Sequence, residues 1–336
     1  MKIGFFEIEG WEEGYVRGGL PSDKVIFSAE RVDDTHIPSE RDFDVISVFI
    51  DSIVTDAVLE KFPNLKFVTT RSTGFNHVDV IAAKKRNISV GYVPGYGDNT
   101  VAEFTFGLIL SLTRKIYQAI DQVKESGSFS LVGLRGIDIG GKVLGVIGTG
   151  RIGREVITIA KGFGMSILAF DPAPDKIYAE KNGIAYVALE ELLRRSDIVT
   201  IHCPYNENTH HLLNKKNIIY MKQGAYLINT ARGGIIETSA LVDALEKGMI
   251  AGAGLDVLEE EGGTKDEIDF LRAAHPKEAE LRVLLQNHAL MKMSNVLVTP
   301  HAAFNSQEAL QRILEITVSN IKQFSLGSPQ NIVKTL

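Results

Sequence analysis

The feature that most constrains this chain is a glycine-rich turn near its middle, Gly148-Thr149-Gly150-Arg151-Ile152-Gly153. An apolar run, residues 143–147, comes directly before the turn, and helical periodicity follows over residues 152–163. In a strand–turn–helix unit with this spacing, Gly148 permits the tight turn and Gly150 lets the backbone approach a pyrophosphate. Gly153 lets the helix pack closely on the strand. The turn therefore predicts a dinucleotide-binding unit, with the phosphates at the helix N-terminus.

An acidic residue follows at the spacing that such a unit requires. Asp171 closes the next predicted strand, residues 167–170, roughly twenty residues after the turn. A carboxylate there can accept hydrogen bonds from ribose hydroxyls, and it repels a 2′-phosphate. The sequence therefore predicts NAD rather than NADP as the cofactor.

The mid-chain position of the turn predicts how the chain divides. A dinucleotide domain normally begins near its glycine turn, so the residues before about 100 must form something else. Short apolar runs alternate with helix candidates there and again after Lys142, which is typical of parallel sheets covered by helices. We expect an α/β chain with two doubly wound parallel-sheet domains and the active site in the cleft between them. A Rossmann domain, residues 100–299, would be inserted into a flavodoxin-like substrate domain, residues 1–99 and 300–336.

A long helix is predicted where the first domain ends. Thr100 and Glu103 have the spacing of a capping box, and apolar residues recur at helical spacing from there to about Glu125. The helix has more apolar faces than one domain contact needs, which favours a homodimer through the nucleotide domains.

Composition excludes several classes of function. The net charge of -6 argues against a nucleic-acid partner, because phosphate binding requires clustered Lys and Arg. The single cysteine allows no intrachain disulfide, and no apolar run has the length and flanks of a membrane span. We expect a cytoplasmic protein. His202, His210 and His211 do not have the spacing of a metal site, so no metal is expected.

Polar residues follow the ends of three strands in the second half of the chain. Arg232 comes after strand 225–229, Glu261 after strand 252–257, and His301 after strand 296–298. Ligands of open α/β sheets bind beyond the carboxyl ends of the strands, so these three side chains can converge. Reduction of a 2-oxo acid requires a cation for the carboxylate and carbonyl, an acid, and a group that keeps the acid charged. Arg232, His301 and Glu261 would fill these roles in that order.

An ordered set of motifs resembles the D-isomer-specific 2-hydroxyacid dehydrogenase family, and within it the D-lactate dehydrogenases. The resemblance covers nearly the whole chain. Besides the glycine turn, it is carried by residues 70–75, 93–96, 202–204, 209–214, 229–233, 254–257 and 299–304.

The resemblance implies roles for individual residues. Arg232 would bind the substrate carboxylate and carbonyl, His301 would be the acid–base residue, and Glu261 would be its partner. The implied cofactor contacts are Arg151, Ile152, Cys203, Pro204, Thr209, Thr230, Ala231 and Asp256. The implied substrate contacts are the backbone N–H groups near Thr73 and Gly74, with Tyr96 and Phe304 as pocket walls.

Two departures leave the substrate open. The segment Phe49-Ile50-Asp51 differs from the pattern of many relatives, and the stretch between Glu261 and His301 is long enough for a distinctive lid. Pyruvate is the expected substrate, and glyoxylate, hydroxypyruvate or a branched 2-oxo acid are alternatives. An alternative hypothesis is a regulator similar to transcriptional corepressors, which would use NAD to control its binding to other proteins.

Overall fold

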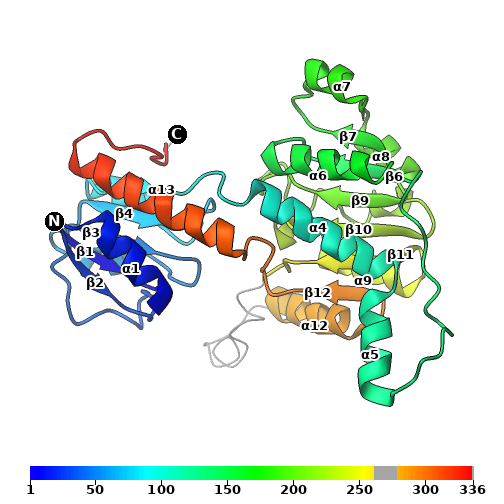
Figure 1. The fold of residues 1–336 in the computed structure, drawn as a ribbon, viewed down its shortest axis with the longest axis horizontal. Coiled ribbons are helices and arrows are strands. Elements are labelled where there is room, and N and C mark those ends of the chain that lie inside the picture. Colours follow the sequence, from blue (N-terminus) through cyan, green and yellow to red (C-terminus); the bar gives the residue numbers. More distant parts are fainter. Residues whose placement is uncertain (261–277, 335–336) are drawn as a thin grey trace. The chain divides into compact units, whose positions relative to one another are not determined.

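The computed structural model describes residues 1–260 and 278–334, and these form two compact units. One unit comprises Met1–Tyr96 and Asn305–Leu336, and the other comprises Gly97–Phe304 (Figure 1). Residues 97–99 and 300–304, expected in the outer domain, belong to the second unit. No helix of the described chain has the length and apolarity to cross a membrane.

The first unit is built on a five-stranded parallel sheet of order β2-β1-β3-β4-β5. Its strands are β1 (Lys2–Phe5), β2 (Lys24–Phe27), β3 (Val45–Val48), β4 (Phe67–Thr70) and β5 (Ser89–Gly91). Its helices are α1 (Gly10–Gly19), α2 (Asp56–Glu60), α3 (Val80–Lys85) and α13 (Gln307–Ser325). One apolar cluster joins α2 and α3 to the sheet, and a second joins α1 and α13 to it. Helices therefore cover both faces, as predicted for a doubly wound sheet.

The second unit has a seven-stranded parallel sheet of order β12-β11-β10-β9-β6-β7-β8. Its strands are β6 (Val143–Ile147), β7 (Ser166–Phe170), β8 (Ala185–Tyr186), β9 (Ile198–Ile201), β10 (Ala225–Asn229), β11 (Ile250–Leu255) and β12 (Val296–Val298). Its helices are α4 (Asp98–Thr113), α5 (Ile116–Ser126), α6 (Arg151–Gly162), α7 (Lys176–Asn182), α8 (Leu189–Arg195), α9 (Thr238–Glu246) and α12 (Glu278–Lys292). Two buried apolar clusters pack on its two faces. The predicted fold class, with two parallel sheets covered by helices, is confirmed.

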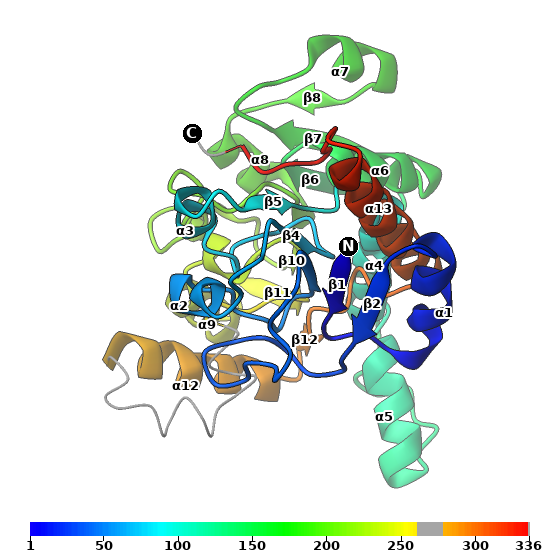
Figure 2. The same cartoon turned by 90° about the vertical axis from the view of Figure 1, so that its left-hand side faces the viewer.

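The single long helix predicted from Asn99 to about Glu125 is wrong. Lys115 has a left-handed backbone (φ 56°), which ends α4 and lets α5 leave in a new direction. The later chain holds this end, because the N–H of Ile137 donates to the carbonyl oxygen of Thr113 at 2.8 Å. The capping box is also wrong, since α4 begins at Asp98 and Thr100 lies inside its first turn. Both views show α5 extending away from the sheet of its unit (Figures 1 and 2).

Candidate active site

The glycine turn joins β6 to α6 as the sequence predicts. Gly148 has a left-handed backbone (φ 92°), and a Cβ there would lie 2.6 Å from the backbone nitrogen of Cys203. A Cβ on Gly153 would lie 2.1 Å from the carbonyl oxygen of Gly148. A Cβ on Gly150 would meet no atom within 4 Å, so this backbone is open to an approaching ligand. Because Gly150 is also the N-cap of α6, no side chain there competes for the first N–H groups of the helix.

Asp171 is fixed in place at the end of β7. It accepts hydrogen bonds from the backbone N–H and the hydroxyl of Thr149, at 2.8 and 3.1 Å, and from the N–H of Ala173 at 2.9 Å. The Thr149 hydroxyl also lies 2.7 Å from the Tyr186 hydroxyl of β8. These contacts tie the acid to the glycine turn. Sequence reasoning missed Thr149 and Tyr186, because Thr149 occupies a variable position of the motif and Tyr186 lies far away in sequence.

The loop after β9 carries three of the expected cofactor residues. The Thr209 hydroxyl donates to the Pro204 carbonyl at 2.7 Å and so closes this loop. Burial raises the pKa of the Cys203 thiol to about 11, which leaves it an uncharged, apolar group. His202 is bonded to the Thr200 hydroxyl at 2.8 Å, and burial lowers its pKa to about 3. Cys203 and its neighbours therefore present neutral surface beside the glycine turn.

Arg151 and Ile152, which are also expected to contact the cofactor, lie at the start of α6. Arg151 is well exposed and donates through Nε to Asp98 at 2.7 Å. Ile152 is half-buried against the apolar cluster of its unit.

Arg232 sits in a tight turn after β10. The Asn229 amide braces this turn, donating to the Arg232 carbonyl at 2.9 Å and accepting from the Ala231 N–H at 3.0 Å. Gly233 must be a glycine, since a Cβ would lie 1.9 Å from the carbonyl carbon of Leu258. Thr230 is buried, with its hydroxyl 3.1 Å from that of Thr105 on α4. Sequence reasoning missed Asn229, although a buried amide that ends a strand is a recognisable turn signal.

His301 is held in a left-handed turn (φ 53°) after β12. Asp256, at the end of β11, controls this turn through both its backbone and its side chain. Its carbonyl accepts the His301 N–H at 2.8 Å. Its carboxylate accepts the Thr299 hydroxyl at 2.5 Å and the N–H groups of Ala302 and Ala303, both at 2.8 Å. Burial raises the pKa of Asp256 above its usual range, and these hydrogen bonds oppose the rise. With 1% exposure, Asp256 acts as a brace for the histidine turn.

The acidic run after β11 is not uniformly solvated. Glu259 is partly buried, and its carboxylate accepts the Thr238 hydroxyl at 2.6 Å and lies 2.6 Å from Nε2 of His211. Glu259 therefore does not lie on a solvated face, although acidic runs usually do, because Thr238 and His211 supply polar partners. Glu260 is exposed. Glu261 lies outside the described residues, as does the segment 261–277 of the expected lid.

His210 and His211 are stacked with ring centroids 3.9 Å apart, and His210 also lies 3.0 Å from the Tyr205 hydroxyl. Within residues 1–260 and 278–334, no group of three or more His, Cys, Asp or Glu could hold a metal ion.

A cavity of about 960 Å³ reaches the histidine turn within the second unit. Its walls come mostly from apolar residues of α4, the end of α12 and β12, and Tyr117 of α5 borders it. Asp256 and His301 also line it. The residues that line it do not include the glycine turn, so this cavity is separate from the phosphate region.

In the first unit, the loop after β4 carries the expected substrate contacts. The Ser72 hydroxyl donates to the Gly74 carbonyl at 2.5 Å, and the Thr73 hydroxyl donates to the Val93 carbonyl at 2.8 Å. No hydrogen bond of the described chain uses the N–H of Thr73 or Gly74. This braced loop therefore offers two N–H donors, as a carboxylate site requires.

The two residues expected to form walls of the substrate pocket belong to different units. Tyr96 belongs to the first unit, where its carbonyl accepts Nε of Arg312 at 2.6 Å. Phe304 belongs to the second unit, with its ring edge-on to that of His301 at a centroid distance of 6.5 Å.

Comparisons with known proteins identify the family of the chain. A sequence model described as D-isomer specific 2-hydroxyacid dehydrogenase, NAD binding domain, matches residues 106–303. The chain is 37% identical to a 2-hydroxyacid dehydrogenase homolog of Haemophilus influenzae, with 99% of each chain covered. It is 36% identical to an aromatic 2-oxoacid reductase of Clostridium sporogenes, with 91% of each covered.

The fold is similar to the crystal structure of a D-lactate dehydrogenase of Aquifex aeolicus complexed with NAD and lactic acid. The TM-score is 0.85, with 33% identity and 99% of each chain covered. The chain therefore belongs to the D-isomer-specific 2-hydroxyacid dehydrogenases, and it is an NAD-dependent enzyme that reduces 2-oxo acids.

Proposed function

We propose that this enzyme reduces pyruvate, or a slightly larger 2-oxo acid, to the D-2-hydroxy acid. The observation that carries the proposal is the pair of braced turns at the ends of β10 and β12, which present Arg232 and His301. Asp256 links the two turns, because its N–H donates to the Asn229 carbonyl at 2.9 Å while its carboxylate holds the His301 turn. The choice of pyruvate is supported by the similarity to a protein solved with lactic acid.

The residues of the second unit fit a bound NAD. The open backbone at Gly150 and the start of α6 suit a pyrophosphate, and Asp171 suits the ribose hydroxyls. Arg151, Ile152, Cys203, Pro204 and Thr209 would line the groove, with Thr230 and Ala231 toward the nicotinamide. The reduced cofactor supplies the hydride.

In this proposal the chain's own residues handle charge and the proton. Arg232 binds the substrate carboxylate and polarises the carbonyl oxygen through its guanidinium group. His301 donates a proton to the oxygen as negative charge develops there. Glu261 keeps His301 protonated and oriented, and Asp256 acts through the turn rather than by touching the substrate.

The first unit would supply backbone N–H donors for the substrate carboxylate. The free N–H groups of Thr73 and Gly74 are suited to this role, because they donate to no other group of the described chain. Tyr96 and Phe304 would limit the size of the substrate side chain.

The decisive experiment measures NADH oxidation with pyruvate, glyoxylate, hydroxypyruvate, a branched 2-oxo acid and phenylpyruvate. We expect pyruvate or its nearest homologue to have the highest kcat/KM, and the product to be the D isomer by chiral chromatography. A preference for phenylpyruvate would favour the second candidate, which the similarity to an aromatic 2-oxoacid reductase supports. Failure to turn over any of these acids would refute the proposed range of substrates.

We also propose that the protein is a cytoplasmic homodimer. Four apolar side chains on α5 are exposed: Ile116, Tyr117, Ile120 and Val123. In the following loop, Phe129, Leu131 and Val132 are each more than 80% exposed. So much apolar surface on one projecting element is typical of an interface between subunits.

A further inference from the structure

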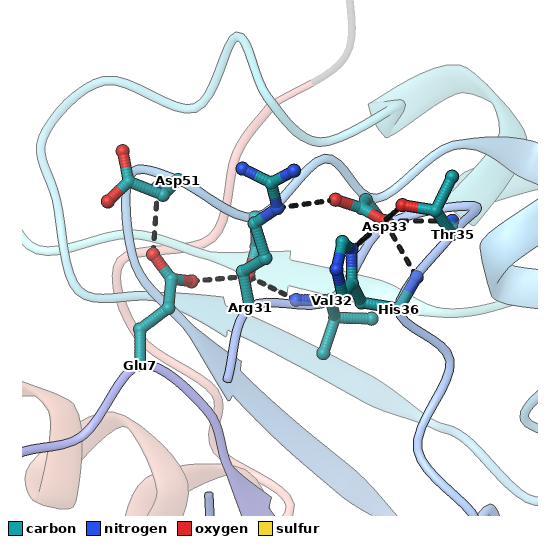
Figure 3. A network of polar contacts seen from close by, with 8 residues as sticks. Glu7, Arg31, Val32, Asp33, Thr35, His36 and Asp51 are labelled. Atoms are coloured by element: carbon teal, nitrogen blue, oxygen red, sulfur yellow. Dashed lines mark hydrogen bonds and ion pairs between the residues drawn. The ribbon is translucent and has the colours of Figure 1, made fainter. Parts of the chain in front are cut away.

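Glu7 has an unusual conformation directly after β1. It is not a glycine, yet its backbone is left-handed (φ 54°), which is unfavourable for a residue with a Cβ. Its carboxylate faces the segment that leaves β3, residues 49–52. It accepts the N–H groups of Phe49 and Asp51, both at 2.8 Å, and the hydroxyl of Ser52. Figure 3 shows the contact with Asp51. One side chain therefore fixes three points of this segment.

Arg71 holds Glu7 from the other side. Arg71 is 1% exposed, and its guanidinium group donates to the carbonyl oxygens of Phe6 and Glu7, at 2.8 and 2.5 Å. It also donates to the Ser47 hydroxyl at 3.2 Å and lies 5.4 Å from the centroid of the Phe49 ring. The ion pairs of the described chain do not include Arg71. Backbone and hydroxyl oxygens accept its hydrogen bonds, and the nearby carboxylates of Glu12 and Glu7 counter part of the cost of burying its charge. Arg71 thus joins Glu7, the end of β3 and the Phe49 ring.

These contacts lie at the ligand-binding edge of the first unit. Residues 49–52 follow the carboxyl end of β3, and the loop with Thr73 and Gly74 follows the carboxyl end of the neighbouring β4. The two segments are directly joined, because the Arg71 N–H donates to the Val48 carbonyl at 2.9 Å. Ligands of open parallel sheets bind at this edge. Glu7 and Arg71 therefore position the backbone of residues 49–52 beside the N–H donors proposed for the substrate carboxylate.

Stability alone gives no reason for this arrangement. A left-handed Glu and a buried Arg that makes no direct salt bridge both cost free energy, and such costs concentrate where a ligand requires a defined shape. A second polar cluster around Asp33 holds the adjacent loop, and the Ser52 hydroxyl accepts the Val32 N–H at 2.9 Å (Figure 3). The segment 49–52 is therefore held from two sides.

We propose that Glu7 and Arg71 are positioning residues that set which 2-oxo acid side chains the enzyme accepts. They do so by fixing Phe49 and the backbone of residues 49–52. This inference rests on the proposed function, because it requires the substrate to bind at the carboxyl edge of the first sheet. Neither residue touches the reacting atoms, so both act on substrate selectivity rather than on the chemical step.

The test is Glu7→Gln, which keeps the shape of the side chain but replaces one accepting oxygen by an NH2 group. That NH2 group would face an N–H donor of residues 49–52. Because two donors cannot form a hydrogen bond, the segment would be released. The matched control is Asp44→Asn at the amino end of β3, where the carboxylate accepts the Lys2 N–H at 2.9 Å and the Lys66 ammonium at 3.0 Å. Both carboxylates link β1 to β3 through backbone N–H groups, Asp44 at the amino ends of the two strands and Glu7 after their carboxyl ends.

The measurement is the ratio of kcat/KM for phenylpyruvate to that for pyruvate, with KM for NADH in parallel. We expect Glu7→Gln to raise the ratio about tenfold, comparable to adding or removing one or two methylenes in a pocket. The KM of Glu7→Gln for NADH should match that of wild type. The ratio of the two kcat/KM values in Asp44→Asn should also match wild type. A general loss of folded enzyme would lower both kcat/KM values equally and leave the ratio unchanged.

A second variant keeps the inference testable if Glu7→Gln folds poorly. Ser52→Ala removes one donor to Glu7 and should shift the ratio in the same direction by a smaller factor. The inference is wrong if neither variant changes the ratio more than Asp44→Asn does, while wild type reduces 2-oxo acids normally. If wild type reduces none of them, the proposed function itself fails.

Discussion

At the scale of single residues, the site depends on carboxylates that hold backbone. Asp256 braces the His301 turn, Glu7 braces the segment after β3, and Glu259 ties the acidic run to Thr238. Motif spacing predicts the residues that face a ligand, because their chemistry is dictated by that ligand. It does not predict Glu7 or the burial of Glu259, because their hydrogen-bond partners are distant in sequence.

Asp171 determines the coenzyme in our proposal. Wild type should prefer NADH to NADPH by at least about tenfold in kcat/KM, or about 1.4 kcal/mol, because the carboxylate repels a 2′-phosphate. Asp171→Ser should narrow this ratio. Steady-state kinetics with both coenzymes tests this, and Asp243→Ser, an exposed acid on α9, is the control. Equal use of the two coenzymes by wild type would contradict the role of Asp171.

Glu261 should control the pH dependence of catalysis. In the reducing direction His301 must arrive protonated, and a carboxylate within hydrogen-bond reach favours the imidazolium form. Glu261→Gln should therefore move the basic limb of the pyruvate-reduction profile to lower pH. Lactate oxidation requires neutral His301, so its acidic limb should move to lower pH as well.

The measurement is initial rate against pH in both directions. Glu260→Gln is the matched control, because Glu260 is exposed. Glu259→Gln should lower stability without moving either limb, since Glu259 bonds to Thr238 and His211. Movement of the limbs in Glu259→Gln or Glu260→Gln but not in Glu261→Gln would show that the register through this acidic run is wrong.

At the scale of elements, apolar periodicity predicts where strands and helices lie but not where a helix is interrupted. The strands on either side of the glycine turn follow the sequence pattern, since each is a short apolar run bounded by turn residues. The break between α4 and α5 follows instead from contact between Thr113 and the chain near Ile137, 24 residues later. No local pattern around Arg114 and Lys115 signals that contact.

The interrupted helix gives a sharper prediction about assembly. The exposed apolar surface lies on α5 and the loop after it, so Ile120→Lys and Phe129→Ser together should weaken the proposed dimer. Light scattering at working concentrations should give a dimeric mass for wild type and a smaller mass for the double variant. As a control, Ile177→Lys changes an apolar residue on α7 that is more exposed than Ile120, and it should leave the mass unchanged. A monomeric mass for wild type would refute the dimer.

At the scale of the whole molecule, the mid-chain glycine turn predicts that one domain is inserted into another. The reason is topological, because a dinucleotide domain starts at its first strand and the chain before it needs a sheet of its own. Hydrophobic patterning does not predict the boundaries of the units. Residues 97–99 and 300–304, expected in the first unit, belong to the second unit. Residues 97–99 begin α4 and residues 300–304 contain the His301 turn, and their placement depends on tertiary contacts such as those of Asp256.

The two units should respond differently to cofactor. Each has its own buried apolar clusters, and the glycine turn, Asp171 and the loop after β9 all lie in the second unit. At about one hundred times Kd, NADH should stabilise that unit by about 2.7 kcal/mol, which slows exchange of its most protected amides about a hundredfold. Hydrogen exchange with mass spectrometry should show this slowing in β6, β9 and β10, with little change in β1, β3 and β4. The slowing should diminish in Asp171→Ser at the same NADH concentration. Equal slowing in both sheets would show that the chain unfolds as one cooperative body, against the two-unit description.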